Sequence, residues 1–80
     1  TASPPDLLKL DMGLIRDIDR EPNKQAVVNG IITMMTQLGG RIVAEGVESV
    51  EEYAWLRTRG IRLFQGYLFA RPGFETLPEP

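Results

Sequence analysis

The chain has 80 residues, of which 42% are hydrophobic and 25% are charged, and its formal net charge is -2. This composition is typical of a globular protein, and the mixture of acids and bases argues against a general nucleic-acid or membrane-surface binder, which needs a basic patch. A chain of this length forms at most one small domain and buries only roughly 60% of its unfolded surface.

The absence of cysteine and histidine limits the chemistry of any site in this chain. Without cysteine, neither a disulfide framework nor a thiolate metal site is available. A metal site would have to use oxygen ligands, which favour Mg²⁺, Mn²⁺ or Ca²⁺ over Zn²⁺. No apolar stretch in this piece approaches the roughly 18 residues of a membrane span.

The first predicted elements are a short strand and a short helix. The chain opens with TASPPD, which resembles the middle of a longer protein, and its two adjacent prolines favour extended backbone. Residues 7–11 are a strand candidate. Residues 12–18 follow as one or two helical turns that we expect to end near Pro22.

A longer helix is predicted next, with Asn23 as its N-cap. Its apolar residues recur at the three- and four-residue spacing of one helix face, namely Val27, Val28, Ile31, Ile32, Met35 and Leu38. Gly39 and Gly40 supply a left-handed stop. Gly30 lowers helix stability by about 1 kcal/mol relative to alanine, so we expect a close contact there.

The second predicted strand is RIVAE, residues 41–45. Its apolar residues follow one another without alternation, which is typical of a strand covered on both faces in a parallel sheet. Ser49 and Glu52 then match a capping box, which predicts the start of another helix. This helix is expected to run to about Arg59 and to end at Gly60.

A third strand is predicted over residues 61–64, ending in Gln65 and Gly66, and residues 67–72 are predicted to form a final loop or short turn. The resulting order of strand, helix, strand, helix, strand predicts an α/β fold built from right-handed βαβ units. Such a unit is neither a closed barrel nor a full doubly wound sheet, and it leaves at least one sheet edge open. We therefore expect a fragment of a larger domain.

Polar residues gather at the predicted carboxyl ends of the strands: Lys9 and Asp11 at the first, Glu45 at the second and Gln65 at the third. In α/β sheets and (β/α) barrels this end carries the ligand site. A lysine beside two carboxylates can hold a phosphate, and the carboxylates can hold a hard cation.

Each of these residues also has a purely structural interpretation. Lys9 can extend its charge from a half-exposed strand, and Asp11 can cap the helix that follows. Glu45 can be a solvated strand end, and Gln65 can be a turn residue. Glu48 can simply face the dipole of the next helix. Composition and spacing alone do not decide between these interpretations and a polar site.

Longer strings of residues carry a family resemblance. PDLLKLD, AEGVE and QGYLFARP occur in this order, with a helix of suitable length between each. Together they resemble the C-terminal part of an EAL domain, the bacterial phosphodiesterase of cyclic di-GMP. The resemblance covers about residues 5–72 and leaves 73–80 as a tail. It implies that residues 1–80 belong to one EAL domain, a modified TIM-like (β/α)8 barrel, and supply roughly its last three strand units.

The resemblance also implies a reaction. Two Mg²⁺ or Mn²⁺ ions activate a water that opens one phosphodiester of cyclic di-GMP, giving linear pGpG. Lys9 and Glu45 match the family's catalytic residues, with Glu45 as metal ligand or general base and Lys9 holding the water or the scissile phosphate. Gln65 and Pro72 match positions at the substrate. The resemblance implies supporting roles for three more residues, Asp11, Gly46 and Glu48.

Other parts of the family pattern are not in this sequence. The glutamate of the E-A-L string, an asparagine ligand and paired aspartates belong to the upstream half of the domain. We therefore expect the isolated chain to be inactive, while the intact domain acts in the bacterial cytoplasm.

A sensor or cyclase domain, a homodimer, or a membrane anchor elsewhere in the parent protein are further expectations, and DNA binding is not expected. The alternatives are a non-catalytic EAL domain, which binds cyclic di-GMP or a partner protein, and a self-standing α/β interaction module.

Overall fold

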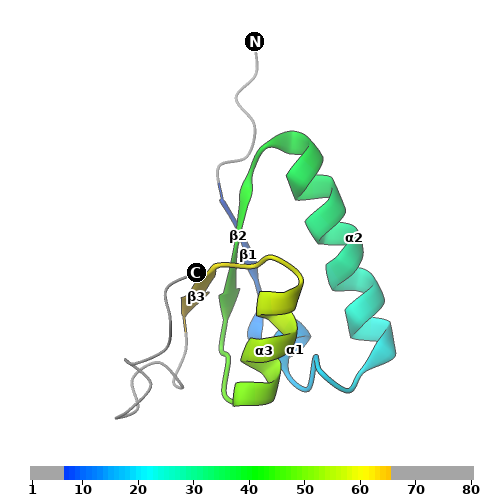
Figure 1. Cartoon of the computed structure of the whole chain (residues 1–80), viewed down its shortest axis with the longest axis vertical. Helices are drawn as coiled ribbons and strands as arrows, with labels where there is room; N and C mark the ends of the chain where they lie inside the picture. Colours follow the sequence, from blue (N-terminus) through cyan, green and yellow to red (C-terminus); the bar gives the residue numbers. More distant parts are fainter. Residues whose placement is uncertain (1–6, 66–80) are drawn as a thin grey trace.

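The computed structural model describes residues 7–65, which form an α/β unit around one small parallel sheet (Figure 1). The predicted α/β class and the predicted alternation of strands and helices are confirmed. The elements in chain order are β1 (Leu7–Leu10), α1 (Met12–Ile15), α2 (Pro22–Leu38), β2 (Arg41–Glu45), α3 (Val50–Thr58) and β3 (Leu63–Gln65). The predicted loop over residues 67–72 lies outside the described residues.

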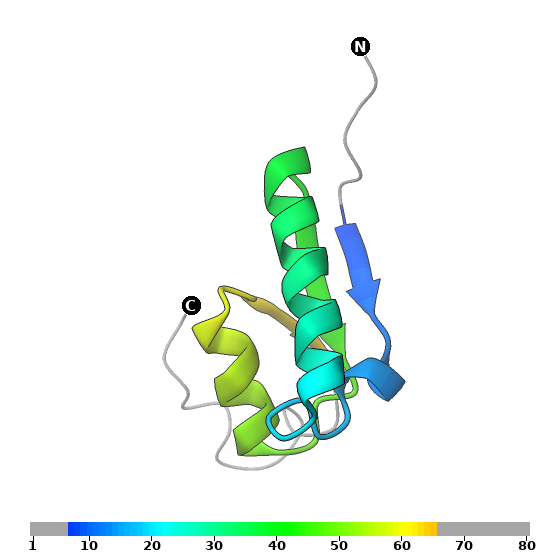
Figure 2. The same cartoon turned by 90° about the vertical axis from the view of Figure 1, so that its right-hand side faces the viewer.

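The sheet has the order β1-β2-β3, and both neighbouring pairs are parallel. Leu10 lies beside Ala44, which in turn lies beside Phe64, so these side chains share one face of the sheet. Figures 1 and 2 show α2 and α3 against the same face. The strands run in one direction, and their carboxyl ends lie where α1 follows β1 and α3 begins (Figure 1).

The hydrophobic core fills the space between this face and the helices. Its fully buried members include Leu10 and Ala44 from the strands, Val28 from α2 and Leu56 from α3. Burial of a large aliphatic side chain contributes about 1.5–3 kcal/mol. The core therefore fixes the helices on one face, while the opposite face of the sheet carries Lys9 and Glu45.

The beginning of α2 differs from the prediction. Pro22 is the first helical residue and Glu21 occupies the N-cap without a side-chain hydrogen bond, so the assignment of Asn23 as N-cap is wrong. The physical reason is that proline has a φ already suited to the first helical position, where its missing N–H is not needed.

The apolar face of α2 is narrower than predicted. Val28 and Met35 are buried, whereas Val27 and Leu38 are 51% and 45% exposed. The helix packs on one side only, so residues at the margins of its apolar stripe remain in solvent. The close contact expected at Gly30 is also wrong, because no described atom other than those of its chain neighbours and its own helix backbone lies within 4 Å of a Cβ built there.

The ends of the helices follow the sequence signals more closely. Gly39 adopts φ +74° and closes α2, as predicted. The capping box at α3 is confirmed, since Ser49 Oγ accepts a hydrogen bond from the Glu52 N–H at 3.1 Å. The third strand begins later than predicted, because Ile61 is still tied to the end of α3 through its N–H bond to the Leu56 carbonyl. None of the helices within residues 7–65 is long and apolar enough to cross a membrane.

Candidate functional site

The predicted convergence of Lys9, Glu45 and Gln65 is observed on the face of the sheet opposite the helices. Glu45 and Gln65 are register partners on β2 and β3. Lys9 is the register partner of Val43, which lies two residues before Glu45 on the same strand. Since side chains alternate along a strand and partners share a face, all three side chains project to one side.

Lys9 and Glu45 are in direct contact. Lys9 Nζ lies 3.3 Å from Glu45 Oε2, and the two side chains are 62% and 29% exposed. An ion pair this accessible contributes little to stability, because water screens it and two long side chains must be ordered. Its cation and its carboxylate remain available to an incoming phosphate or metal ion.

Glu45 ends β2 because Gly46 turns the chain directly after it. Gly46 has φ +77°, a left-handed conformation that other residues rarely adopt. A Cβ at this position would overlap the Cβ of Met12 and lie 3.2 Å from its Cα. The Gly46 N–H donates to the Gln65 carbonyl at 2.8 Å, which joins the ends of β2 and β3. The turn therefore requires glycine for two independent reasons.

The other predicted residues have structural contacts of their own. Asp11 caps α1, where its Oδ2 accepts the Gly13 N–H at 2.9 Å, so the capping interpretation of Asp11 describes its observed contact. Glu48 Oε2 pairs with Arg16 at 3.2 Å and its side chain is 55% exposed. The role of Glu48 in ordering the loop stays a prediction. Pro72, predicted at the rim, lies outside the described residues.

The sequence analysis did not predict the contacts of Arg16 or the long-range contacts of Glu52. Glu52 is 3% exposed and is the buried charged side chain among the described residues. Beyond its capping-box bond, it accepts the N–H of Asp17, 35 residues earlier in the chain, at 2.9 Å. Arg16 contacts both Glu52 and Glu48. The capping box indicated only the local bond of Glu52, because nothing in the local pattern shows which distant segment packs against it.

The chemistry of the site suits a hard cation but does not complete a metal centre. Glu45 supplies oxygen donors at a partly open strand end. Within residues 7–65, no group of three or more acidic, histidine or cysteine side chains gathers to hold an ion. The described part of the chain therefore places a carboxylate, an ammonium and an amide at the ends of neighbouring strands.

Comparison with known proteins agrees with this geometry. A family model for the EAL domain matches residues 1–72. The cyclic di-GMP phosphodiesterase PdeR of Escherichia coli is 44% identical over 69 residues, which are 86% of this chain and 10% of PdeR.

Solved structures give the same result. A standalone EAL protein of Vibrio cholerae with bound cyclic di-GMP superposes with a TM-score of 0.80 at 44% identity, covering 92% of this chain and 31% of that one. The manganese and cyclic di-GMP complex of Klebsiella pneumoniae BlrP1 gives a TM-score of 0.76 at 50% identity, covering 80% and 16%. The chain spans less than a third of these relatives. Sequence, fold and site thus lead to one conclusion: the chain belongs to the EAL domain family.

Proposed function

We propose that this chain is the C-terminal portion of an EAL domain that hydrolyses cyclic di-GMP to linear pGpG. The observation that carries the proposal is the 3.3 Å pair of Lys9 and Glu45 at the carboxyl ends of neighbouring parallel strands. Relatives named as cyclic di-GMP phosphodiesterases, and EAL structures containing cyclic di-GMP, support this substrate.

In the proposed reaction, water adds across one phosphodiester bond. Its oxygen forms the new bond to phosphorus, the bond from phosphorus to the leaving ribose oxygen breaks, and that oxygen gains a proton. The step needs no oxidant or reductant. Bound divalent ions, Mg²⁺ or Mn²⁺, supply a water of lowered pKa and neutralise phosphate charge. Manganese in the BlrP1 complex supports a divalent cofactor.

The proposed roles follow from the positions of the side chains. Glu45 provides a carboxylate at the end of β2 as metal ligand or general base. Lys9 places its ammonium beside Glu45, where it can hold the attacking water or the scissile phosphate. Gln65, next to Glu45 in register, contacts the substrate. Gly46 holds the turn, and the rim position of Pro72 is proposed from the family resemblance alone.

The intact domain needs more ligands than this chain holds. The described residues contain no cluster of three potential ligands, so the upstream half of the domain is the proposed source of the others. The 80-residue chain alone is then expected to produce no pGpG. A sensor or cyclase domain in the parent protein is a further proposed partner, supported by a BlrP1 structure that holds FMN as well as cyclic di-GMP.

The test is chromatographic detection of pGpG from cyclic di-GMP and Mn²⁺, using the intact domain that contains this chain. Glu45→Gln should lower turnover by about 100-fold or more. Glu51→Gln is the matched control, because it removes the same charge from an exposed position at the start of α3. Equal turnover by the wild-type and Glu45→Gln domains would refute the role of Glu45. Binding of cyclic di-GMP without pGpG formation by the wild-type domain would instead establish the non-catalytic alternative.

A further inference from the structure

The turn that follows Glu45 is held by a residue from a distant part of the chain. Arg16, which follows α1, donates from its Nη1 to the Gly46 carbonyl at 3.3 Å. Its Nη2 lies 3.2 Å from Glu48 Oε2. Arg16 thus contacts the residue directly after Glu45 and a side chain two residues further along the same turn.

Buried Glu52 completes this arrangement. Its Oε2 accepts the Asp17 N–H at 2.9 Å and lies 3.4 Å from Arg16 Nη1. Its Oε1 accepts the Glu48 N–H at 2.9 Å. One carboxylate therefore ties the segment after α1 to the turn before α3. A carboxylate buried to this extent needs a cationic partner, and Arg16 is that partner.

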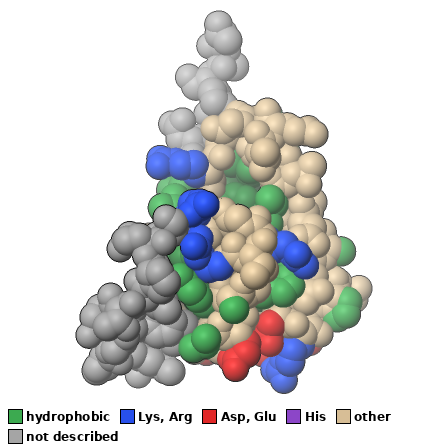
Figure 3. All heavy atoms as spheres, viewed as in Figure 1, with side chains coloured by type: hydrophobic (Ala, Val, Ile, Leu, Met, Phe, Trp, Pro, Cys, Tyr) green, Lys and Arg blue, Asp and Glu red, His purple; other side chains and the backbone are tan. Residues whose placement is uncertain are grey.

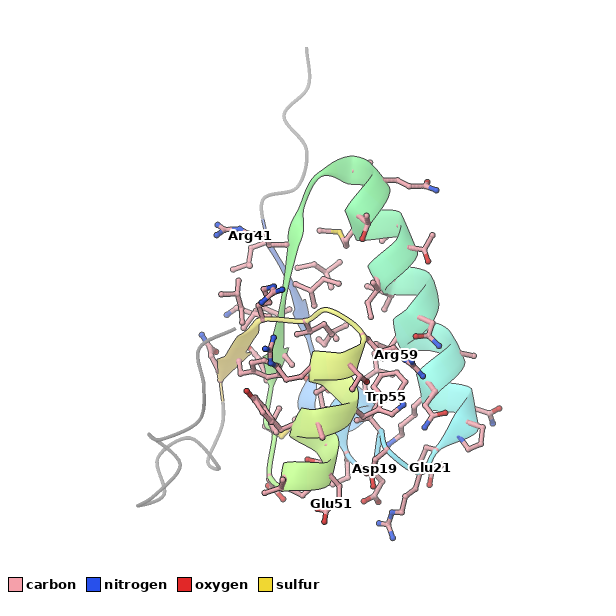
Figure 4. The ribbon with its side chains drawn as sticks, viewed as in Figure 1. Asp19, Glu21, Arg41, Glu51, Trp55 and Arg59 are labelled. Carbon is pink, nitrogen blue, oxygen red and sulfur yellow. The ribbon has the colours of Figure 1, made fainter. Side chains whose placement is uncertain are left out.

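Two arginines lie among the charged side chains at this end of the molecule, and they differ in what they contact. Acidic side chains gather here beside basic ones, as the lower part of Figure 3 shows. They line a polar depression of about 520 Å³ that includes Asp19 and Glu51, which Figure 4 shows at this same end. Arg20 also lines this depression, but its side chain is 71% exposed and, among the described residues, it forms an ion pair only with Asp17. Arg16 is 34% exposed and is the arginine that contacts the backbone of the turn.

The chemistry of arginine explains why this residue occupies the position. A guanidinium presents five N–H donors in a planar fork, so it can serve a carbonyl and two carboxylates at once. A lysine ammonium keeps the charge but cannot reproduce that fork. Both backbone polar groups of Gly46 are therefore held, its N–H by the Gln65 carbonyl and its carbonyl by Arg16.

We propose that Arg16 is a positioning residue that aims the Glu45 carboxylate at the divalent cation by holding the Gly46 carbonyl in the turn that follows Glu45. The inference rests on the proposed function, because it takes Glu45 as a metal ligand. Gly46 has φ +77° and lacks a side chain, so the turn has a wide conformational range unless it is held. Releasing the carbonyl lets Glu45 sample more directions and weakens the cation site.

The test measures Mn²⁺ binding by calorimetry in the intact domain, together with kcat and KM for cyclic di-GMP. Arg16→Lys is expected to weaken Mn²⁺ binding by about tenfold, as loss of a residue that orients a metal ligand typically does. It should leave the melting temperature of the metal-free protein nearly unchanged, since the charge beside Glu52 remains. Saturating Mn²⁺ should restore most of kcat. Arg20→Lys, the matched control, should bind Mn²⁺ like the wild type.

Each outcome separates the inference from the proposed function. If the wild-type domain binds Mn²⁺ and forms pGpG while Arg16→Lys binds Mn²⁺ equally well, the inference is wrong and the proposed function stands. If the wild-type domain neither binds Mn²⁺ nor forms pGpG, the inference and the proposed function are both wrong. Where Arg16→Lys melts early, the double variant Arg16→Met with Glu52→Gln removes the buried charge together with its partner. Its Mn²⁺ affinity should also fall about tenfold, and wild-type affinity would overturn the inference.

Discussion

Replacing Gly46 with alanine tests the geometry of the turn that positions Glu45. Two penalties apply. A non-glycine residue in the left-handed conformation, here φ +77°, costs roughly 1–2 kcal/mol. The new methyl group would also overlap the Cβ of Met12, and overpacking of this kind costs about 1–3 kcal/mol. We therefore expect Gly46→Ala to lower the free energy of unfolding by about 2–5 kcal/mol.

Gly39 provides the matched control. It has nearly the same φ, +74°, yet no described atom lies within 4 Å of a Cβ at that position. Gly39→Ala should thus show the backbone penalty alone, about 1–2 kcal/mol. Urea denaturation of the intact domain measures both variants, and the difference between them isolates the contact with Met12.

A double-mutant cycle makes this prediction refutable. Met12→Gly removes the Cβ that an alanine at position 46 would meet, so the double variant should recover part of the loss. If Gly46→Ala costs no more than Gly39→Ala, or if Met12→Gly gives no recovery, the close approach of α1 to the turn is not the reason for glycine. A loss at the upper end of the range expected for Gly46→Ala would unfold a marginally stable domain entirely, since the total stability of a domain is only about 5–15 kcal/mol.

Three further predictions concern single interactions. Lys9→Met should change the free energy of unfolding by less than about 1 kcal/mol, because the Lys9 side chain is 62% exposed, yet lower pGpG formation by about 100-fold; a loss of both in parallel would contradict a catalytic role. Ser49→Ala should destabilise the domain by about 1 kcal/mol in urea denaturation, because the Glu52 N–H loses its cap, and an unchanged midpoint would show that the cap is dispensable. The hydrogen bond from Arg20 holds the pKa of Asp17 below its ordinary value of 3.8. The ion pair of Asp17 and Arg20 therefore stabilises the fold above pH 3.8, and this stabilisation is lost as the pH falls through the lowered pKa of Asp17. The difference in melting temperature between wild type and Arg20→Ala should accordingly vanish in strong acid and shrink in high salt; a difference that grows in acid would refute this sign.

Local sequence signals predicted much of the fold because their causes are local. Gly39 closes α2 and Ser49 opens α3, since each acts through backbone groups within a few residues. The prediction failed where a position depends on what packs beside it. Val27 fits the apolar spacing of α2 but remains 51% exposed, and Gly30 makes no close contact with a described atom. The spacing of apolar residues along a helix indicates which face is buried, but it does not indicate how much of that face the neighbouring elements cover.

The candidate site shows the same difference between features that local sequence predicts and contacts that depend on packing. The sequence by itself predicted that Lys9, Glu45 and Gln65 lie at or near the carboxyl ends of neighbouring parallel strands, because each pair of strands is joined by a helical crossover long enough for a parallel βαβ unit. Only the tertiary structure decided that Lys9 touches Glu45, and that Arg16 and Glu52 hold the turn after it. These contacts join residues about 30 or more positions apart, as the 35 residues between Asp17 and Glu52 illustrate. Their partners are selected by three-dimensional packing, which no local stretch of the chain encodes.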